Sequence, residues 1–149
     1  MNGVRFAGYA ALFERRDRGG DTIAPGAFAV SLRRRLAAGE ALPILWQHDP
    51  AQPIGAVEHV AEDARGLRVI GRVSSGRAGA LLRAGAVDGL SFGYRVVEAK
   101  AGETRRLEAL DLVEVSLVKH PMQPLARVHA VELVQNGTDF AVFCGENVK

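Results

Sequence analysis

The chain has 149 residues and a mass of 15.9 kDa, with 48% hydrophobic and 24% charged residues. This length is typical of one domain and is sufficient to bury a substantial core. Nineteen basic and seventeen acidic residues give a net charge of +2, which is too small an excess to indicate nucleic-acid binding. The single cysteine, Cys144, excludes an internal disulfide, and no apolar run reaches the roughly 18–20 residues of a membrane span. Because the first residues also lack a secretion-signal pattern, we expect a soluble intracellular protein.

The first third of the chain predicts one strand and one helix. Apolar residues alternate at the start of residues 4–12, as they do in a strand. Residues 27–38 predict a helix, and its apolar stripe consists of Phe28, Leu32 and Leu36 at spacings of four.

The rest of the chain predicts mainly strands. Strand patterns occur at residues 42–46, 54–60, 66–73, 90–98, 104–110 and 112–118. A second helix is predicted over residues 76–86, and residues 126–133 fit either a helix or a strand. The expected fold is therefore mainly β with helices (α+β), with six or seven strands and two or three helices. Because many strands follow one another directly, an antiparallel, barrel-like sheet is favoured over a doubly wound parallel one.

Two other functions have weaker support in the sequence. The run of arginines at 33–35 could bind nucleic acid, but on the predicted helix it is more typical of a solvated face. Asp21, His48 and Asp49 are residue types that bind metals, but no His-x-x-x-His or Cys-x-x-Cys spacing accompanies them. We therefore predict no metal site, no cofactor and no nucleic-acid partner.

Ser91 is a candidate nucleophile. It lies in Gly89-Leu90-Ser91-Phe92-Gly93, which fits the G-x-S-x-G pattern of a nucleophile elbow. An elbow needs a helix after the serine, whereas the following residues predict a strand, so we reject an elbow. What remains is a serine between two glycines, where the backbone can approach a substrate closely. Such a serine can also be purely structural.

His48 is a candidate general base. It follows the apolar strand predicted at residues 42–46, so a rigid element would hold its imidazole near the surface. A histidine can accept a serine proton near neutral pH, although His48 can equally be a structural residue packed by the neighbouring tryptophan. His59 lies in an alternating strand and is expected at the surface. His120 and His129 flank prolines, and either can be a loop residue or a third catalytic member.

Glu114 is a candidate third residue. It lies inside an apolar strand, where a carboxylate is costly to bury without a partner. Val113, Val115 and Leu117 share one face of that strand, so Glu114 lies on the other face with Ser116. It can point to solvent there, or it can accept a hydrogen bond from a histidine ring and fix the tautomer of that ring.

Several segments, taken in order, carry a resemblance to a known family. They are GYAALF at 8–13, GDTIAPGAF at 20–28, LWQHD at 45–49, PIG at 53–55, GLRV at 66–69, GLSFGY at 89–94 and LVEVSLV at 112–118, followed by Pro121. Together they resemble the prohead (capsid maturation) protease family of tailed phages with HK97-type capsids. The resemblance covers residues 3–131, and its specificity lies in the order of the segments rather than in any one of them.

The resemblance implies a fold and a set of catalytic residues. The family is similar to the herpesvirus assembly proteases, which form a closed β-barrel surrounded by helices and use a histidine, a serine and a third residue in that order. By that resemblance His48 is the general base and Ser91 is the nucleophile. The third position falls on Glu114, with Asp111 and His120 as alternatives close by in the sequence.

The implied chemistry is acyl transfer by a serine endopeptidase. The tetrahedral oxyanion of that reaction needs preorganised hydrogen-bond donors. In the herpesvirus relatives these are backbone N–H groups and an arginine-held water, whereas this chain has Pro121 and Met122 in that region. Lys119 and Arg127 are the nearby cations, so the resemblance leaves the donors open.

The resemblance also implies what the protein acts on. Family members cleave scaffolding segments of the capsid protein, and generally themselves, inside the assembling prohead in the bacterial cytoplasm. The implied partners are the major capsid protein with its scaffolding segment, the portal protein and further copies of the chain as a homo-oligomer, with no nucleic acid and no membrane. The protease domain would cover residues 1–131, with a C-terminal tail of unknown role at 132–149. The alternative is a catalytically idle capsid assembly scaffold or chaperone with the same fold.

Overall fold

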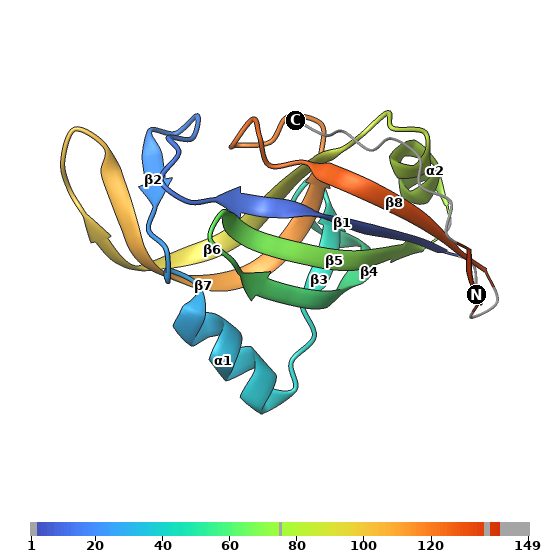
Figure 1. The fold of residues 1–149 in the computed structure, drawn as a ribbon, viewed down its shortest axis with the longest axis horizontal. Coiled ribbons are helices and arrows are strands. Elements are labelled where there is room, and N and C mark those ends of the chain that lie inside the picture. The colour runs from blue at the N-terminus through green and yellow to red at the C-terminus, as the bar shows by residue number, and fades with distance from the viewer. Residues whose placement is uncertain (1–2, 75, 136–137, 141–149) are drawn as a thin grey trace.

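The computed structural model describes residues 3–74, 76–135 and 138–140, which form a mainly β structure with two helices (Figure 1). The strands are β1 (Gly3–Leu12), β2 (Asp21–Ile23), β3 (Pro43–Trp46), β4 (Asp49–Glu62), β5 (Gly66–Ser74), β6 (Gly89–Lys100), β7 (Arg105–Val118), β8 (Val128–Gln135) and β9 (Thr138–Phe140). The helices are α1 (Ala29–Ala38) and α2 (Arg77–Arg83). The predicted fold class is confirmed. In the described part of the chain, neither helix is long and apolar enough to cross a membrane.

The strands form one sheet that is organised around β7. Its order is β2-β7-β3-β4-β5-β1-β8-β9, and β6 pairs with the other edge of β7. β2 and β3 run parallel to the two ends of β7, whereas the remaining ladders are antiparallel. The start of β6, the end of β7 and the end of β3 therefore lie side by side, and this is where the candidate site residues are found.

The closed barrel is not confirmed. Within the described residues the ladder runs from β6 to β9 as an open path, and an isolated bridge between Gly89 and Arg127 spans the remaining gap. The segment between β7 and β8 contains Pro121 and Pro124, which cannot donate ladder hydrogen bonds. The sheet thus curves around its core without a continuous strand pairing to close it.

The count and length of strands also differ from the prediction. The structure has nine strands in its described part, because β2 and β9 are too short to show a pattern in the sequence. Residues 104–110 and 112–118 form the single strand β7, since Asp111 continues the ladder opposite Arg95. Within the segment 126–133, residues 128–133 form strand rather than helix, as part of β8.

The predicted apolar stripe of α1 is wrong in part. Phe28 is fully buried, but Leu36 is 85% exposed. At 100° per residue, Leu36 lies roughly 80° around the helix from Phe28, whereas Arg35 lies only about 20° away. The Arg35 side chain accordingly turns toward the sheet, where Nη2 donates to the Leu112 carbonyl oxygen at 2.7 Å. Only the first two members of the arginine run are fully on the solvated face.

The tail predicted after residue 131 begins inside β8, which continues to Gln135. Residues 136–137 and 141–149 of that tail, with Cys144, lie outside the described residues. The domain boundary therefore remains a prediction.

Candidate active site

The pairing of β6 with β7 brings the predicted serine and carboxylate together. Ser91 lies opposite Ser116, and Gly93 lies opposite Glu114. Directly paired residues point to the same face of a sheet, so these four positions share one face. Ser91 and Glu114 are each only 7% exposed.

The two glycines of the G-x-S-x-G segment are explained by close packing. A Cβ at Gly93 would overlap the Glu114 carboxylate, so this position must be glycine for the carboxylate to lie against β6. A Cβ at Gly89 would lie 2.5 Å from the Val118 carbonyl oxygen and 2.9 Å from Pro121. The segment is therefore continuous strand with two close approaches, and the rejection of an elbow is confirmed.

His48 lies in the two-residue turn between β3 and β4. Trp46 pairs with Asp49, and both residues of the turn have positive φ, 53° for Gln47 and 61° for His48. This is the conformation of a type I′ turn, for which Asn-Gly is preferred. A non-glycine residue in it stores of order 1–3 kcal/mol, and such strain is found mainly at functional positions. The strand predicted before His48 is thus confirmed as β3.

The Glu114 carboxylate connects His48 to the sheet. Its Oε1 lies 2.6 Å from His48 Nδ1, and its Oε2 accepts a hydrogen bond from Ser116 Oγ at 2.5 Å. The Ser116 oxygen in turn accepts the backbone N–H of His48 at 3.1 Å. Because an ionised carboxylate only accepts, Nδ1 carries a proton and Nε2 of the neutral ring is left as an acceptor.

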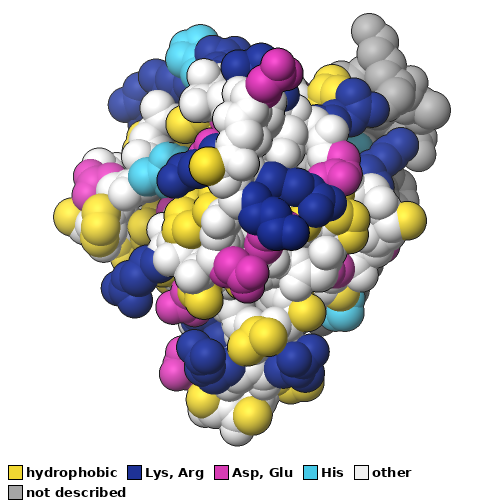
Figure 2. All heavy atoms as spheres, turned by 90° about the vertical axis from the view of Figure 1, so that its left-hand side faces the viewer, with side chains coloured by type: hydrophobic (Ala, Val, Ile, Leu, Met, Phe, Trp, Pro, Cys, Tyr) yellow, Lys and Arg dark blue, Asp and Glu magenta, His cyan; other side chains and the backbone are white. Residues whose placement is uncertain are grey.

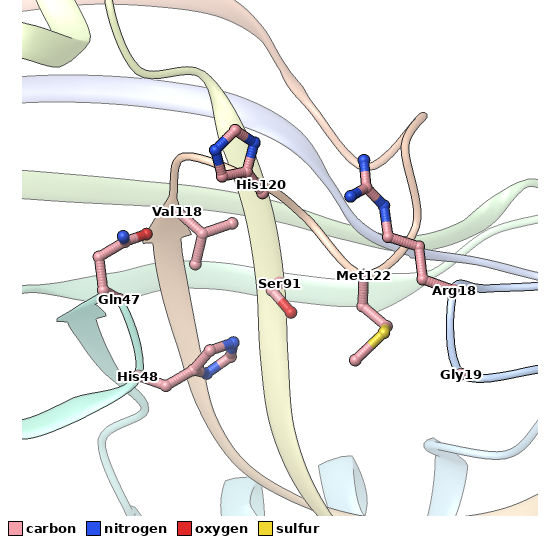
Figure 3. Close-up of a pocket in the computed structure, with 8 residues that line it drawn as sticks. All are labelled: Arg18, Gly19, Gln47, His48, Ser91, Val118, His120 and Met122. Carbon is pink, nitrogen blue, oxygen red and sulfur yellow. The ribbon is translucent and has the colours of Figure 1, made fainter.

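Ser91 and His48 face one cavity of about 510 Å³. Figure 3 shows a nitrogen of the His48 ring directed toward Ser91 across it. The remaining lining residues are Arg18, Gly19, Gln47, Val118, His120 and Met122. Glu114 is not among them, since it lies behind the His48 ring. The pocket therefore presents a hydroxyl and a ring nitrogen to a bound molecule, while the carboxylate is shielded from it.

The other candidates have different surroundings. Asp111 lies 3.3 Å from the Ser31 hydroxyl of α1, and His120 lines the pocket without a described contact to His48. His59 is exposed on β4, as predicted. His129 packs against the Tyr9 ring, and burial lowers the pKa of His129, with Arg68 and Arg65 adding to the effect.

Asp21, His48 and Asp49 do not form a metal-binding group within the described residues. Asp21 is held by Arg105 across two hydrogen bonds of 2.8 and 3.0 Å, and Asp49 accepts the backbone N–H of Ala51. Among residues 3–74, 76–135 and 138–140, no three His, Cys, Asp or Glu side chains gather closely enough to hold a metal ion.

The cations near the pocket differ from those expected. Arg127 pairs with Asp88 at 2.8 Å, and Lys119 lines a neighbouring cavity. Arg18 lines the pocket instead, and its backbone N–H donates to the Met122 carbonyl oxygen at 3.0 Å. Nothing in the sequence indicates Arg18, because a loop between β1 and β2 brings it there. The sequence does indicate Ser116, because the strand pattern places it on the same face as Glu114.

The surface beyond the pocket carries both charges. Figure 2 shows basic side chains lying beside acidic ones on the face that includes β2 and α1. Ion pairs that involve β2 and β7 include Arg105 with Asp21 at 2.8 Å and Arg106 with Glu14 at 2.9 Å. The hydrogen bond from Arg105 lowers the pKa of Asp21, which keeps this carboxylate ionised.

Two solved structures of viral proteases have a similar fold. The capsid assembly protease gp21 of bacteriophage T4 aligns with a TM-score of 0.61 and 18% identity, over 78% of this chain and 81% of that one. The KSHV protease in complex with a hexapeptide phosphonate inhibitor aligns with a TM-score of 0.57 and 13% identity, over 90% of this chain and 66% of that one. This chain therefore shares its fold with these two viral proteases.

The sequence then identifies the family. It matches the family described as Caudovirus prohead serine protease over residues 1–139, and the chain belongs to that family. The prohead protease of Enterobacteria phage HK97 is 33% identical over 99 residues, which are 62% of this chain and 43% of that protein. The chain thus spans less than half the length of this relative. The predicted resemblance is confirmed.

Proposed function

We propose that this protein is a serine endopeptidase in which Ser91 is the nucleophile, His48 the general base and Glu114 the residue that orients His48. The observation that carries the proposal is the 2.6 Å contact between His48 Nδ1 and Glu114 Oε1, with the other side of the ring directed at Ser91 (Figure 3). This is the geometry of nucleophile, base and orienting group that activates a hydroxyl.

The proposed reaction has two stages. Ser91 Oγ attacks a peptide carbonyl carbon while His48 Nε2 takes the hydroxyl proton, and the carbonyl oxygen becomes the oxyanion of a tetrahedral intermediate. The intermediate collapses when the C–N bond breaks and the imidazolium gives its proton to the leaving amine. Water, deprotonated by His48, then hydrolyses the acyl-enzyme and restores Ser91. Glu114 stabilises the imidazolium in both stages by its negative charge.

The proposed substrates are the scaffolding segment of the major capsid protein and the protease chain itself, cleaved within the assembling prohead in the bacterial cytoplasm. Support comes from the family and from the names of the T4 and HK97 relatives. Contacts with the portal protein and a homo-oligomer are part of the same proposal. Confinement with many substrate copies raises the effective concentration, which lets a slow protease complete its task.

Co-expression with the major capsid protein that is the proposed substrate tests the activity. Wild-type protein is expected to shorten the capsid protein, and Ser91→Ala and His48→Ala are expected to leave it at full length. Ser74→Ala, on the exposed end of β5, is the matched serine control and is expected to retain cleavage. Cleavage by Ser91→Ala would contradict the assignment.

A serine-directed phosphonate separates this proposal from the idle scaffold. The related KSHV protease was solved with a hexapeptide phosphonate, so a peptide phosphonate is a suitable reagent. We expect one phosphonyl group on Ser91 of the wild type by mass spectrometry and none on His48→Ala. An idle scaffold predicts no labelling, together with normal particle assembly in the presence of His48→Ala.

A further inference from the structure

A second cavity adjoins the catalytic pocket, in the angle between α2 and the β3–β4 hairpin. Its volume is about 620 Å³. Trp46, Ile54, Leu81 and Val87 supply apolar walls, and the charged residues that line it are Arg77 and Lys119. We call this cavity the α2 groove. Nothing in the proposed chemistry uses it.

The α2 groove adjoins the catalytic pocket, because neighbouring residues of two segments line one cavity and then the other. Trp46 lines the groove, whereas the next two residues, Gln47 and His48, line the catalytic pocket. The same change occurs on the opposite segment, where Val118 faces the pocket and Lys119 faces the groove. The Lys119 N–H donates to Gln47 Oε1 at 2.8 Å, so the two segments are fastened together at the boundary. The groove therefore lies within reach of the residues that flank a peptide bond placed at Ser91.

The charged residues that line the groove are both basic. Arg77 and Lys119 are both exposed, and in the described part of the chain neither side chain forms an ion pair or a hydrogen bond. The described lining contains no Asp or Glu. Most other lining residues are apolar, and Trp46 is half-buried with its ring available as a packing surface. Such a site fits a ligand that has an apolar side chain and a carboxylate close together.

We propose that the α2 groove is a substrate subsite that binds an apolar side chain and a neighbouring Asp or Glu of the polypeptide that is cleaved at Ser91. This rests on the proposed function, and it adds a substrate class to it. Trp46, Ile54 and Leu81 would hold the apolar side chain, while Arg77 and Lys119 would receive the carboxylate. The subsite would select acidic, apolar segments over basic ones.

Binding to the inactive Ser91→Ala protein tests the subsite independently of catalysis. A library of synthetic 14-residue peptides is screened for binding. The tightest acidic binder is then compared with a twin peptide in which each Asp or Glu is replaced by Asn or Gln. Trp46 is the only tryptophan in the chain, so its fluorescence reports directly on the groove. We expect a change in Trp46 emission on binding, and roughly five-fold weaker binding of the amide twin.

Charge variants then identify the cations. In the double variant Arg77→Ala/Lys119→Ala, the acidic peptide and its amide twin should bind equally. The Lys119→Glu variant should instead bind more tightly to a peptide in which the acidic residue is replaced by Lys. Arg83→Ala removes an exposed arginine from the same helix outside the groove, and it should leave the preference unchanged. Equal binding of the twins to protein with an intact groove, or binding without a change in Trp46 emission, would overturn the subsite.

A fluorophosphonate without a peptide separates the two proposals. It reaches Ser91 without entering the α2 groove, so its reaction with wild-type protein depends on the nucleophile and base alone. Labelling of Ser91 together with equal binding of the twins contradicts the subsite but not the protease. Absence of labelling together with a clear acidic preference contradicts the protease, and the groove would then be a peptide-binding site without hydrolysis.

Discussion

The Ser116 hydroxyl holds two parts of the site at once. It donates to Glu114 Oε2 and accepts the backbone N–H of His48, so one fully buried atom fixes both the carboxylate and the strained turn. A hydroxyl can do both because it has one donor and two lone pairs. We therefore treat Ser116 as a positioning residue, which acts through His48 rather than on the substrate.

Replacing Ser116 by alanine is expected to lower kcat while KM stays nearly constant. A hydrogen bond to a charged group is worth about 1.5–3 kcal/mol, so the loss in kcat should be roughly ten- to a hundred-fold. Steady-state cleavage of a peptide substrate measures the two constants. Ser116→Thr keeps the hydroxyl and should recover most of the activity.

The matched control for Ser116 is Ser31. This buried serine lies on α1, away from the pocket, and it also bridges to β7, since its hydroxyl accepts the Leu112 N–H at 2.9 Å. Ser31→Ala should lower the free energy of unfolding and leave kcat unchanged. If both alanine variants lost activity in proportion to stability, the role of Ser116 would be structural only.

The sequence predicts the residues of the site better than their geometry. His48, Ser91 and Glu114 follow from residue type, strand pattern and family resemblance, and the structure brings all three to one pocket region. The turn that orients His48 could not be predicted, because Gln47 and His48 lack the Asn-Gly signal of a type I′ turn. Tertiary contacts with β7 impose that turn, and a single sequence does not show them.

At the scale of elements, strands with regular alternation are predicted well and short ones are missed. β1 and β5 agree closely with their predicted ranges because each buries every second side chain. β2 has only three residues, Asp21–Ile23, and its pairing with β7 depends on a partner more than 80 residues away. The Asp21–Arg105 pair stabilises this contact, which no local pattern could reveal.

The Asp21–Arg105 pair predicts a pH dependence of stability. Arg105 lowers the pKa of Asp21 in the folded protein below its ordinary value of about 3.9. A depressed pKa means that the stabilisation is complete above the unfolded pKa and is lost as pH falls through the folded one. Asp21→Asn should thus have a lower urea midpoint at pH 7, and the difference from wild type should shrink as the pH falls below about 5.

Urea titrations of both proteins between pH 7 and pH 3 measure this convergence. Glu14→Gln is the control, because it breaks the neighbouring Glu14–Arg106 pair, whose two side chains are largely exposed. Exposed pairs contribute about 0–1 kcal/mol, so its midpoint should stay close to that of wild type. A difference between Asp21→Asn and wild type that was constant with pH would contradict the ionic contribution.

At the scale of the whole molecule, β6 and β8 are not joined by a continuous ladder. Two backbone hydrogen bonds connect the segments at the starts of these strands instead, and we call this contact the seam. The Leu90 N–H donates to the Ala126 carbonyl oxygen at 2.9 Å, and the Val128 N–H donates to the Asp88 carbonyl oxygen at 2.8 Å. β1 lies beneath this seam, and Gly8 lets it come close enough to pack there. Ser91 follows directly on the seam, so the position of this proposed nucleophile depends on how closely the two edges of the open sheet approach each other.

Gly8→Ala is expected to loosen this seam. The added Cβ would overlap the Arg127 carbonyl oxygen and lie 2.9 Å from Val128 Cα, and backbone atoms cannot move aside as a flexible side chain can. Overpacking of this kind costs about 1–3 kcal/mol, which should appear as a lower urea midpoint. Hydrogen exchange at the Leu90 and Val128 amides should accelerate beyond the effect of global destabilisation, because their hydrogen bonds span the seam.

Gly102→Ala is the control, because its Cβ would have no neighbour closer than 3.4 Å, and it should alter neither the urea midpoint nor the exchange rates. Unchanged exchange at both amides in Gly8→Ala would show that the seam does not depend on the close approach of β1.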